Sequence, residues 1–285
     1  MQIDSIEQQL KMIVESNIEA ENYNWLEGKI NTIIANKSTK DLFMTYSLIA
    51  SKIKLKNDLN TAMVSNDLGR YLEVQKANLR ELSRLYLLTK VTNADIEFFT
   101  PKVANIIQVA DTGELATFLK FLIVLPQCEK YKSVAVDTLR TNIATVFDAI
   151  ALNNPYPGKY FDDNQWNQMY LKAAFMPRDL SKIWDVDKRA NSELARIISD
   201  YAHERWAASR EVNPYFWRPV GSFLNDILLK DMERLFLSSD LIENKAAALC
   251  CHRSKNPKAK SLLNSHLELK EQIENNSLSW ETLKD

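Results

Sequence analysis

One charged side chain is predicted to lie on an apolar helix face. The spacing of apolar residues predicts a helix over residues 192–210, with a core stripe of Leu194, Ile197, Ile198 and Tyr201. Arg205 falls almost at the centre of that stripe. A lone buried charge is very costly, so this guanidinium needs a carboxylate or several carbonyl groups. The nearby acidic residues are Asp163, Asp187, Asp200 and Glu204.

Two interpretations of Arg205 remain open. The side chain either snorkels or forms a plain buried ion pair, which would be structural. Alternatively, it holds an anionic ligand, such as a phosphate or a carboxylate. The walls of that pocket would be Tyr201, Trp206 and Trp217.

Polar residues of the same helix form a second candidate group. Asp200 and His203 are three residues apart, and Glu204 flanks them. An Asp–His pair can perform acid–base chemistry, although a solvated helix face shared with Arg196 also explains the pattern. The metalloprotease motif HExxH is excluded because Ala207 stands at its second His. No GxSxG motif supports a Ser–His–Asp triad.

Composition excludes several classes of function. Only five Gly occur, without GxGxxG or GxxxxGK[ST], so neither a dinucleotide fold nor a P-loop has its usual motif. The net charge of −1 provides no field to attract nucleic acid. The basic run over residues 252–260 is interpreted as a solvated turn, and Cys250-Cys251-His252 lacks CxxC spacing and is interpreted as packing. We predict no metal and no cofactor.

Helix signals recur along the whole chain. Thr100-Pro101, Asn213-Pro214 and Asn256-Pro257 each predict a helix with Pro at its first position. Capping boxes are predicted at Asp111 with Glu114 and at Asp162 with Gln165. Residues 243–263 have the pattern of two helices joined by a short turn. We therefore predict an all-α fold of stacked antiparallel helix pairs, either a HEAT-like α-solenoid or an irregular helical array.

The helices are expected to form a single domain over residues 1–285, because no Pro/Gly/Ser linker divides the chain. Residues 1–90 are less distinctive, residues 91–285 form the helical core, and residues 51–66 are a looser connection. The first ten residues lack the apolar region of a signal peptide. The run Leu115–Leu125 is too short to span a bilayer and is expected to form a buried core helix. With three cysteines in no disulfide pattern, the expected location is the cytoplasm.

The unusual residues gather between Asn153 and Gly221. This stretch holds most of the Trp residues, namely Trp166, Trp184, Trp206 and Trp217. Helical projection of residues 162–175 puts apolar side chains on two faces, so this helix is expected to be covered on both sides. The polar side chains of Asn167, Gln168 and Lys172 would then need partners.

Five blocks of this stretch resemble the EboA family of bacterial metabolite-traffic proteins. The blocks are Asn153-Asn154-Pro155-Tyr156-Pro157, Trp166-Asn167-Gln168-Met169 with Leu171-Lys172-Ala173, Asp187-x-Arg189-Ala190-Asn191, Asp200 to Ala208 with Arg210, and Trp217-Arg218. The resemblance is dense over residues 138–223. It implies no catalytic residues, so the ligand-binding candidates are the shared positions Trp166, Asn167, Lys172, Asp187, Arg189, Asn191, Asp200, Tyr201, His203, Glu204, Arg205, Trp206 and Trp217.

The resemblance also implies partners and a process. The family occurs in a gene cluster with a UbiA-like prenyltransferase, a TatD-like hydrolase, a dehydroquinate-synthase-like enzyme and a sugar-isomerase-like protein, associated with secondary-metabolite precursor export. We therefore expect an accessory protein that binds a small polar or anionic metabolite or a partner enzyme through residues 153–221. One alternative is an enzyme acting on a sugar-like or cyclitol substrate, phosphorylated or not; another is a HEAT-type nucleic-acid binder.

Overall fold

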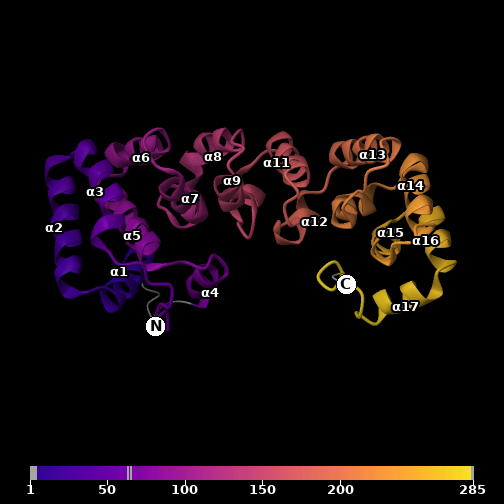
Figure 1. The fold of residues 1–285 in the computed structure, drawn as a ribbon, viewed down its shortest axis with the longest axis horizontal. Helices are drawn as coiled ribbons and strands as arrows, with labels where there is room; N and C mark the ends of the chain where they lie inside the picture. Colours follow the sequence, from indigo (N-terminus) through magenta and orange to yellow (C-terminus); the bar gives the residue numbers. More distant parts are fainter. Residues whose placement is uncertain (1–4, 63, 65, 284–285) are drawn as a thin grey trace. The chain divides into compact units, whose positions relative to one another are not determined.

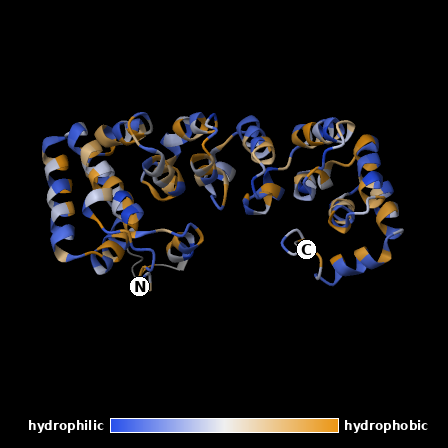
Figure 2. Cartoon of the chain, in the orientation of Figure 1, coloured by the Kyte–Doolittle hydropathy of each residue, from blue (hydrophilic) through white to orange (hydrophobic). Residues whose placement is uncertain are grey.

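The computed structural model describes residues 5–62, 64 and 66–283. Within these ranges all regular secondary structure is helical, which confirms the predicted all-α class. The helices form two compact units, unit 1 over residues 1–156 and unit 2 over residues 157–285 (Figure 1). In both units, hydrophobic and hydrophilic residues intermingle along the helices, as expected for helices with one buried face (Figure 2).

Unit 1 is organised around one central helix, α5 (Leu79–Ala94), which is buried along most of its length. α5 contacts α1, α2, α3, α6 and α7, and α9 packs on α7. The other helices of the unit are α1 (Ile6–Asn17), α2 (Ala20–Asn36), α3 (Thr39–Lys52), α4 (Asn66–Val74), α6 (Ile96–Ala104), α7 (Thr112–Phe121), α8 (Lys132–Thr138) and α9 (Ala144–Ala151). Short 3-10 turns lie at η1 (Asn105–Gln108), η2 (Leu122–Val124) and η3 (Cys128–Tyr131).

Unit 2 has its own central helix, α15 (Leu241–Arg253), which contacts η5, α14, α16 and α17. α10 (Tyr156–Tyr160) begins at the last residue of unit 1. The remaining elements are α11 (Asp163–Phe175), η4 (Leu180–Lys182), α12 (Val186–Arg189), α13 (Ser192–Ala207), η5 (Pro214–Phe223), α14 (Asp226–Phe236), α16 (Pro257–Asn264) and α17 (Leu267–Glu274). Each unit therefore has one helix that contacts several of the other elements of that unit.

Most predicted helix starts are confirmed. Both capping boxes form, at the start of α7 and at the start of α11. Pro257 and Pro214 stand at the start of α16 and of the 3-10 segment η5. The prediction at Thr100-Pro101 is wrong, because Pro101 lies inside α6. That helix begins five residues earlier, where the Asp95 side chain accepts a hydrogen bond from the Phe98 amide and caps it.

Two other expectations need correction. The run over residues 115–125 is buried, but its α-helix ends at Phe121 and continues as the 3-10 turn η2. The buried residues of α11 are Trp166, Asn167, Met169, Tyr170 and Ala173, whereas Gln168 and Phe175 on the other side are exposed, so the helix is not covered on both faces. The predicted helix pair over 243–263 is confirmed as α15 and α16. Among the described helices, none combines the length and apolar character needed to cross a membrane.

Unit 1 contains a buried ion pair that provides a test of its packing. The Arg84 and Glu114 side chains are 7% and 5% exposed, and an Nη2–Oε1 distance of 3.4 Å separates them. The guanidinium also donates from Nε to the Tyr46 carbonyl oxygen at 3.1 Å. A buried arginine that loses its carboxylate keeps its desolvation cost without compensation.

We predict that Glu114→Gln lowers the free energy of unfolding by about 3 kcal/mol, because Gln retains the capping-box function but not the charge. Urea denaturation followed by circular dichroism measures the change. The matched control is Glu97→Gln, since that side chain is 90% exposed and its Lys130 partner lies 3.8 Å away. Equal stability of Glu114→Gln and wild type would contradict this role of the pair.

Candidate functional site

Arg205 is half-buried and binds a backbone carbonyl group. Its Nε and Nη2 atoms donate to the Glu211 carbonyl oxygen at 3.0 and 2.9 Å. Its guanidinium carbon lies 5.9 Å from the centre of the Tyr201 ring. Of the two kinds of partner that the sequence left open, a carboxylate or carbonyl groups, the structure has a carbonyl oxygen, and Arg205 ties the end of α13 to the loop that follows it. A backbone carbonyl group of the same chain therefore fixes the position of this side chain.

The buried stripe of α13 differs from the predicted one, and this explains the error. The buried residues are Leu194, Ala195, Ile198, Ser199 and Ala202. Small side chains make up much of this stripe, whereas Ile197 and Tyr201 are only partly buried. A projection that counts large apolar residues shifts the centre of the stripe toward Arg205.

Asp200 and His203 do not pair with each other. Asp200 accepts a hydrogen bond from Arg196 on the exposed face of α13, and Glu204 is also exposed there. The His203 Nε2 atom instead lies 2.6 Å from Oδ1 of Asp231 on α14. The other carboxylate oxygen of Asp231 accepts a 2.6 Å hydrogen bond from the Ser199 hydroxyl.

Asp231 is a central residue that the sequence analysis missed, because it lies beyond residue 221. It is only 2% exposed and joins α13 to α14 through Ser199 and His203. A signal was present in the sequence, since Asp231 interrupts the apolar face of an amphipathic helix. The buried neighbours on that face are Leu228, Leu229, Met232 and Leu235. A carboxylate at such a position needs buried hydrogen-bond donors.

Two predicted residues pair through their amide groups. The Asn167 and Asn191 side chains exchange hydrogen bonds of 3.2 and 2.8 Å. The Asn191 oxygen also accepts from the Leu194 amide at 2.8 Å and so caps α13. This pair gives the buried Asn167 the partner that the sequence predicted it would need.

Arg189 joins α12 to the start of α11. Its Nη1 atom donates to the carbonyl oxygens of Gly158 at 3.0 Å and Phe161 at 2.8 Å. Its Nη2 atom lies 3.1 Å from the Asp163 carboxylate. The guanidinium carbon stands 5.4 Å from the centre of the Trp166 ring. Arg189, which packs against Trp166, therefore fixes the segment that leads into α11.

Asp187 forms ion pairs with two arginines from distant segments. One carboxylate oxygen lies 2.7 Å from Nη2 of Arg218, and the other lies 3.0 Å from Nη1 of Arg253. Arg218 also pairs with Glu281 at 3.0 Å. Burial opposes the charge on Arg218, but the bond to Asp187 outweighs it and raises the pKa of the guanidinium. The Asp187 carboxylate thereby connects α12, η5 and α15.

An aromatic stack links η5, α13 and α14. The Trp206 ring lies on the buried Trp217 ring, with centres 5.7 Å apart and planes 21° apart. The Arg234 guanidinium carbon lies 4.2 Å from the centre of the Trp206 ring. The His203 ring is 5.7 Å from Trp206. Tyr201 does not join this stack and contacts Phe175 and Phe216 instead.

Three cavities of unit 2 share Glu211 as a lining residue. One of about 570 Å³ is lined by Trp206, Ser209, Arg210, Glu211, Arg234, Leu235, Leu237, Ser238, Ser239 and Glu243. Another of about 650 Å³ includes Arg205, Glu211, Tyr215, Ser238, Ser239, Asp240 and Glu243. The smallest, about 200 Å³, is bounded by Phe175, Tyr201, Arg205 and Glu211, among others.

Of the residues predicted as a site, Tyr201, Arg205 and Trp206 line these three cavities. Trp217 lies buried beneath Trp206, and Lys172 is half-buried on α11. The others lie on the exposed face of α13 or in the contacts between segments described above. Arg210, Glu211 and Ser239 line cavities without having been proposed, because nothing in their local spacing distinguishes them.

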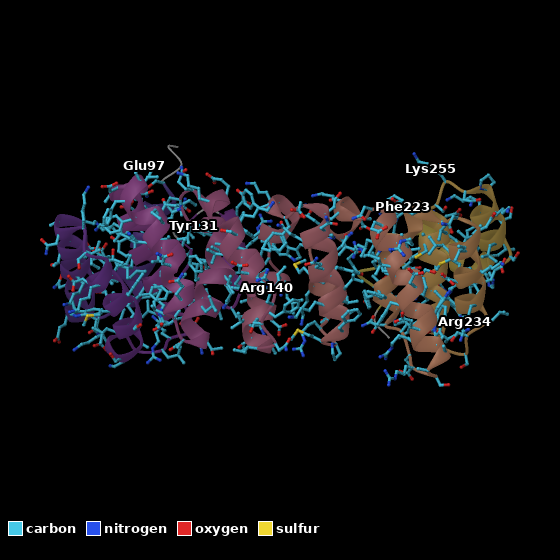
Figure 3. All side chains as sticks on the ribbon, turned by 90° about the horizontal axis from the view of Figure 1, so that it is seen from above. Glu97, Tyr131, Arg140, Phe223, Arg234 and Lys255 are labelled. Atoms are coloured by element: carbon cyan, nitrogen blue, oxygen red, sulfur yellow. The ribbon has the colours of Figure 1, made fainter. Side chains whose placement is uncertain are left out.

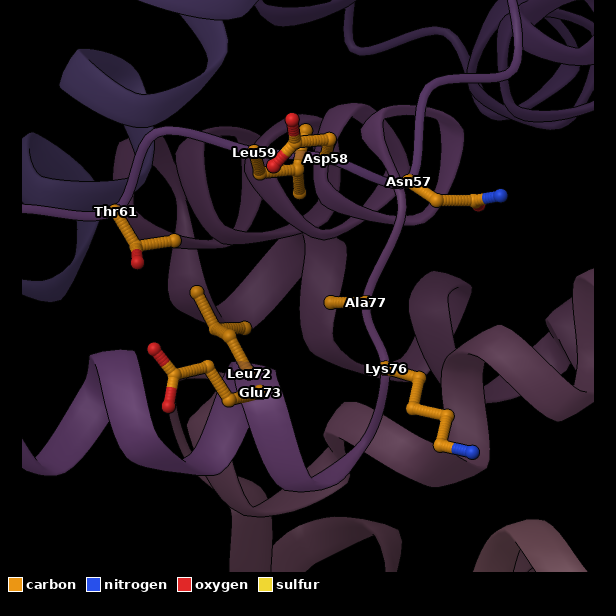
Figure 4. A pocket seen from close by; sticks show the side chains of 8 residues that line it. All are labelled: Asn57, Asp58, Leu59, Thr61, Leu72, Glu73, Lys76 and Ala77. Carbon is orange, nitrogen blue, oxygen red and sulfur yellow. The ribbon is translucent and has the colours of Figure 1, made fainter.

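Another cavity lies in unit 1, far from residues 153–221 in sequence. It has a volume of about 660 Å³ and lies between the segment after α3 and the end of α4 (Figure 4). Leu72 and Ala77 point into the space, whereas the Lys76 side chain points away from it (Figure 4). The groove is open, and its lining mixes apolar residues with polar and charged ones, namely Asn57, Asp58, Leu59, Thr61, Leu72, Glu73, Lys76 and Ala77.

Two of the cysteines are buried in the core, and a lysine of the basic run over residues 252–260 forms an ion pair. Burial raises the pKa of the Cys250 thiol well above its usual value and that of Cys251 to about 12, so both remain thiols.

In the basic run, Lys258 pairs with Asp226 at 2.6 Å. Lys255 lies on the opposite side of unit 2 from Arg234 (Figure 3). No group of three His, Cys, Asp or Glu suited to a metal ion occurs in the described part of the chain.

We predict that Asp231→Asn lowers the free energy of unfolding by about 2 kcal/mol, because a buried charge-assisted hydrogen bond to His203 is lost. The control Asp226→Asn, on the same helix, removes a carboxylate that is 78% exposed and should change stability by less than about 1 kcal/mol. Thermal denaturation of both variants compares them. A larger loss for the control than for Asp231→Asn would refute the importance of the buried carboxylate.

Comparison with known proteins adds one finding. The sequence model of a family described as "Metabolite traffic protein EboA" matches residues 6–221. The match covers more than half of the chain and extends the resemblance through unit 1, beyond the dense blocks over 138–223. It ends before α14, which carries Asp231 and Arg234. No curated protein and no solved structure matches the chain.

Proposed function

Because the chain belongs to the EboA family of metabolite traffic proteins, we propose that it binds a small polar metabolite of that traffic in the cavities around Glu211. The observation that carries this proposal is the convergence of three cavities on one loop of unit 2. Two of them, at about 570 and 650 Å³, have the volume of a small-molecule site. Their lining mixes ionised groups, hydroxyl groups and aromatic rings, as expected for a polar ligand.

The hydrogen-bond partners of the acid–base candidates favour a binding role over catalysis. The Asp200 carboxylate is bound to Arg196, and Arg205 is bound to the Glu211 carbonyl oxygen. His203 is bound to Asp231 and is not among the residues that line the three cavities. A general base must reach the proton that it removes. In our proposal the protein holds its metabolite without changing it.

The family resemblance suggests how binding would serve traffic. Its expected partners are the UbiA-like prenyltransferase, the TatD-like hydrolase, the dehydroquinate-synthase-like enzyme and the sugar-isomerase-like protein. In our proposal these enzymes deliver the metabolite to unit 2 or receive it from there. Open cavities suit this role, because a carrier must release its ligand as readily as it binds it.

We predict that Ser239→Trp abolishes metabolite binding. The side chain lines both large cavities and is exposed, so a bulky replacement fills them without breaking a packed core. The full chain is purified from cells that contain the intact gene cluster, and small molecules released by heating are identified by mass spectrometry. A specific metabolite should accompany the wild type and be lost from the variant by at least about tenfold, or about 1.4 kcal/mol of binding free energy.

The matched control is Ser261→Trp, on the exposed side of α16 and outside the lining of these cavities. It should retain the metabolite at the wild-type level. The proposal is wrong if Ser239→Trp, folded to the same extent, retains the same small molecules and supports the same export as the wild type.

The enzyme alternative retains one observation in its favour. His203 is 51% exposed and is oriented by a buried carboxylate, which resembles the arrangement of a general base. His203→Gln separates the two functions, because a binding protein would retain its metabolite and its export activity. Loss of export with intact metabolite binding in this variant would favour catalysis.

A further inference from the structure

We propose that Arg234 and Arg210 form an anion subsite in the 570 Å³ cavity, which binds the carboxylate or phosphate group of the metabolite. This inference rests on the proposed function and specifies the chemical class of its ligand. It moves the expected anion from Arg205, which binds the Glu211 carbonyl oxygen, to two arginines that the sequence analysis did not select.

The first argument is the absence of a carboxylate partner. In unit 2, Arg189, Arg196, Arg218 and Arg253 each have a carboxylate within ion-pair distance. Within the described ranges, no such partner lies beside the guanidinium of Arg210 or Arg234. Both side chains nevertheless line the same cavity. Two guanidinium groups without a carboxylate partner leave charged N–H donors at one cavity, and a carboxylate or phosphate can accept from them.

The second argument is the fixed orientation of Arg234. Its guanidinium carbon lies 4.2 Å from the centre of the Trp206 ring, and Trp206 in turn lies on the buried Trp217. Stacking occupies the face of a guanidinium group and leaves the N–H donors at its edge available. These donors form a fork that matches two oxygens of a carboxylate or a phosphate. A side chain already held in place loses less entropy when the ligand binds.

The third argument concerns the rest of the lining. Glu211 and Glu243 line the same cavity as the two arginines, so the ionised side chains sum to no net charge. A ligand with several anionic groups would be repelled by the two carboxylates. A metabolite with one anionic group and several hydroxyl or amino groups fits better, because the serines and the carboxylates can bind those groups. Ser209, Ser238 and Ser239 provide the hydroxyl groups.

The two arginines come from different parts of the chain. Arg210 lies within the residues that match the family, whereas Arg234 on α14 lies beyond them. In Figure 3 Arg234 lies at an outer edge of unit 2. The subsite thus joins a residue of the matched region to a residue of a helix outside it.

The test is a titration of the full chain with inorganic phosphate and with acetate, each against chloride at the same ionic strength. The indole N–H signal of Trp206 in ¹H–¹⁵N NMR spectra reports binding, and Trp206→Phe identifies that signal. We expect a saturable shift with at least one anion. A response to phosphate alone identifies a phosphorylated metabolite, and a response to acetate alone identifies a carboxylate; either supports the subsite.

Variants then assign the anion to Arg234. Arg234→Gln should weaken binding of the responding anion at least tenfold, and Arg234→Lys should weaken it less, since the charge remains but the fork is lost. Arg140→Gln, an exposed arginine of unit 1 whose side chain is 86% accessible, serves as the control and should bind as the wild type does. No saturable shift with either anion, or unchanged affinity in Arg234→Gln, overturns the subsite.

Failure of this inference is distinguishable from failure of the proposed function. If Arg234→Gln retains the co-purifying metabolite while Ser239→Trp loses it, the cavity binds a metabolite without an anion subsite. If Ser239→Trp also retains it, the binding function itself is wrong.

Discussion

The close approach of η5 to α15 determines the arrangement of unit 2. A Cβ atom on Gly221 would lie 3.0 Å from the Cys250 carbonyl oxygen and 3.1 Å from its Cα atom, so a larger residue would press against the α15 backbone and push the two elements apart by a few tenths of an ångström. The Cys250 thiol donates to the Trp217 carbonyl oxygen at 3.2 Å. Trp217 is thereby fixed in the core, and Trp206 and then Arg234 stack upon it.

Several residues on which the resemblance to the family rests form contacts between segments of unit 2. Asp187, Arg189 and Asn191 each join segments that are separate in sequence, through ion pairs, carbonyl groups or amide groups. Polar contacts whose groups are all satisfied specify one arrangement of the helices that they join. A shared motif therefore need not mark the residues that touch a ligand. In our account, the side chains that bind the ligand are held in position by these contacts but do not take part in them.

Local features of the fold could be predicted from the sequence, since capping depends on residues three positions apart. The boxes at Asp111 and Asp162 illustrate this. The sequence could show that the Asn167 amide needs a hydrogen-bond partner, but it could not identify that partner as Asn191. Asp231 and Arg234 could not be associated with His203 and Trp206, because those contacts depend on how α14 packs. Arg205 was misassigned because small residues of α13 join Leu194 and Ile198 in the buried stripe, whereas the larger Ile197 and Tyr201 are only partly buried.

The central claim is that framework residues and ligand-binding residues are separate sets, and one measurement tests it most directly. Alanine variants of Asp187, Arg189, Asn191, Arg210 and Arg234 are each assayed for unfolding free energy and for metabolite export in cells. The account predicts that the first three lose stability and export together, while the two arginines lose export at wild-type stability. Full export by the Arg210 and Arg234 variants, or equal destabilisation of all five, would contradict it.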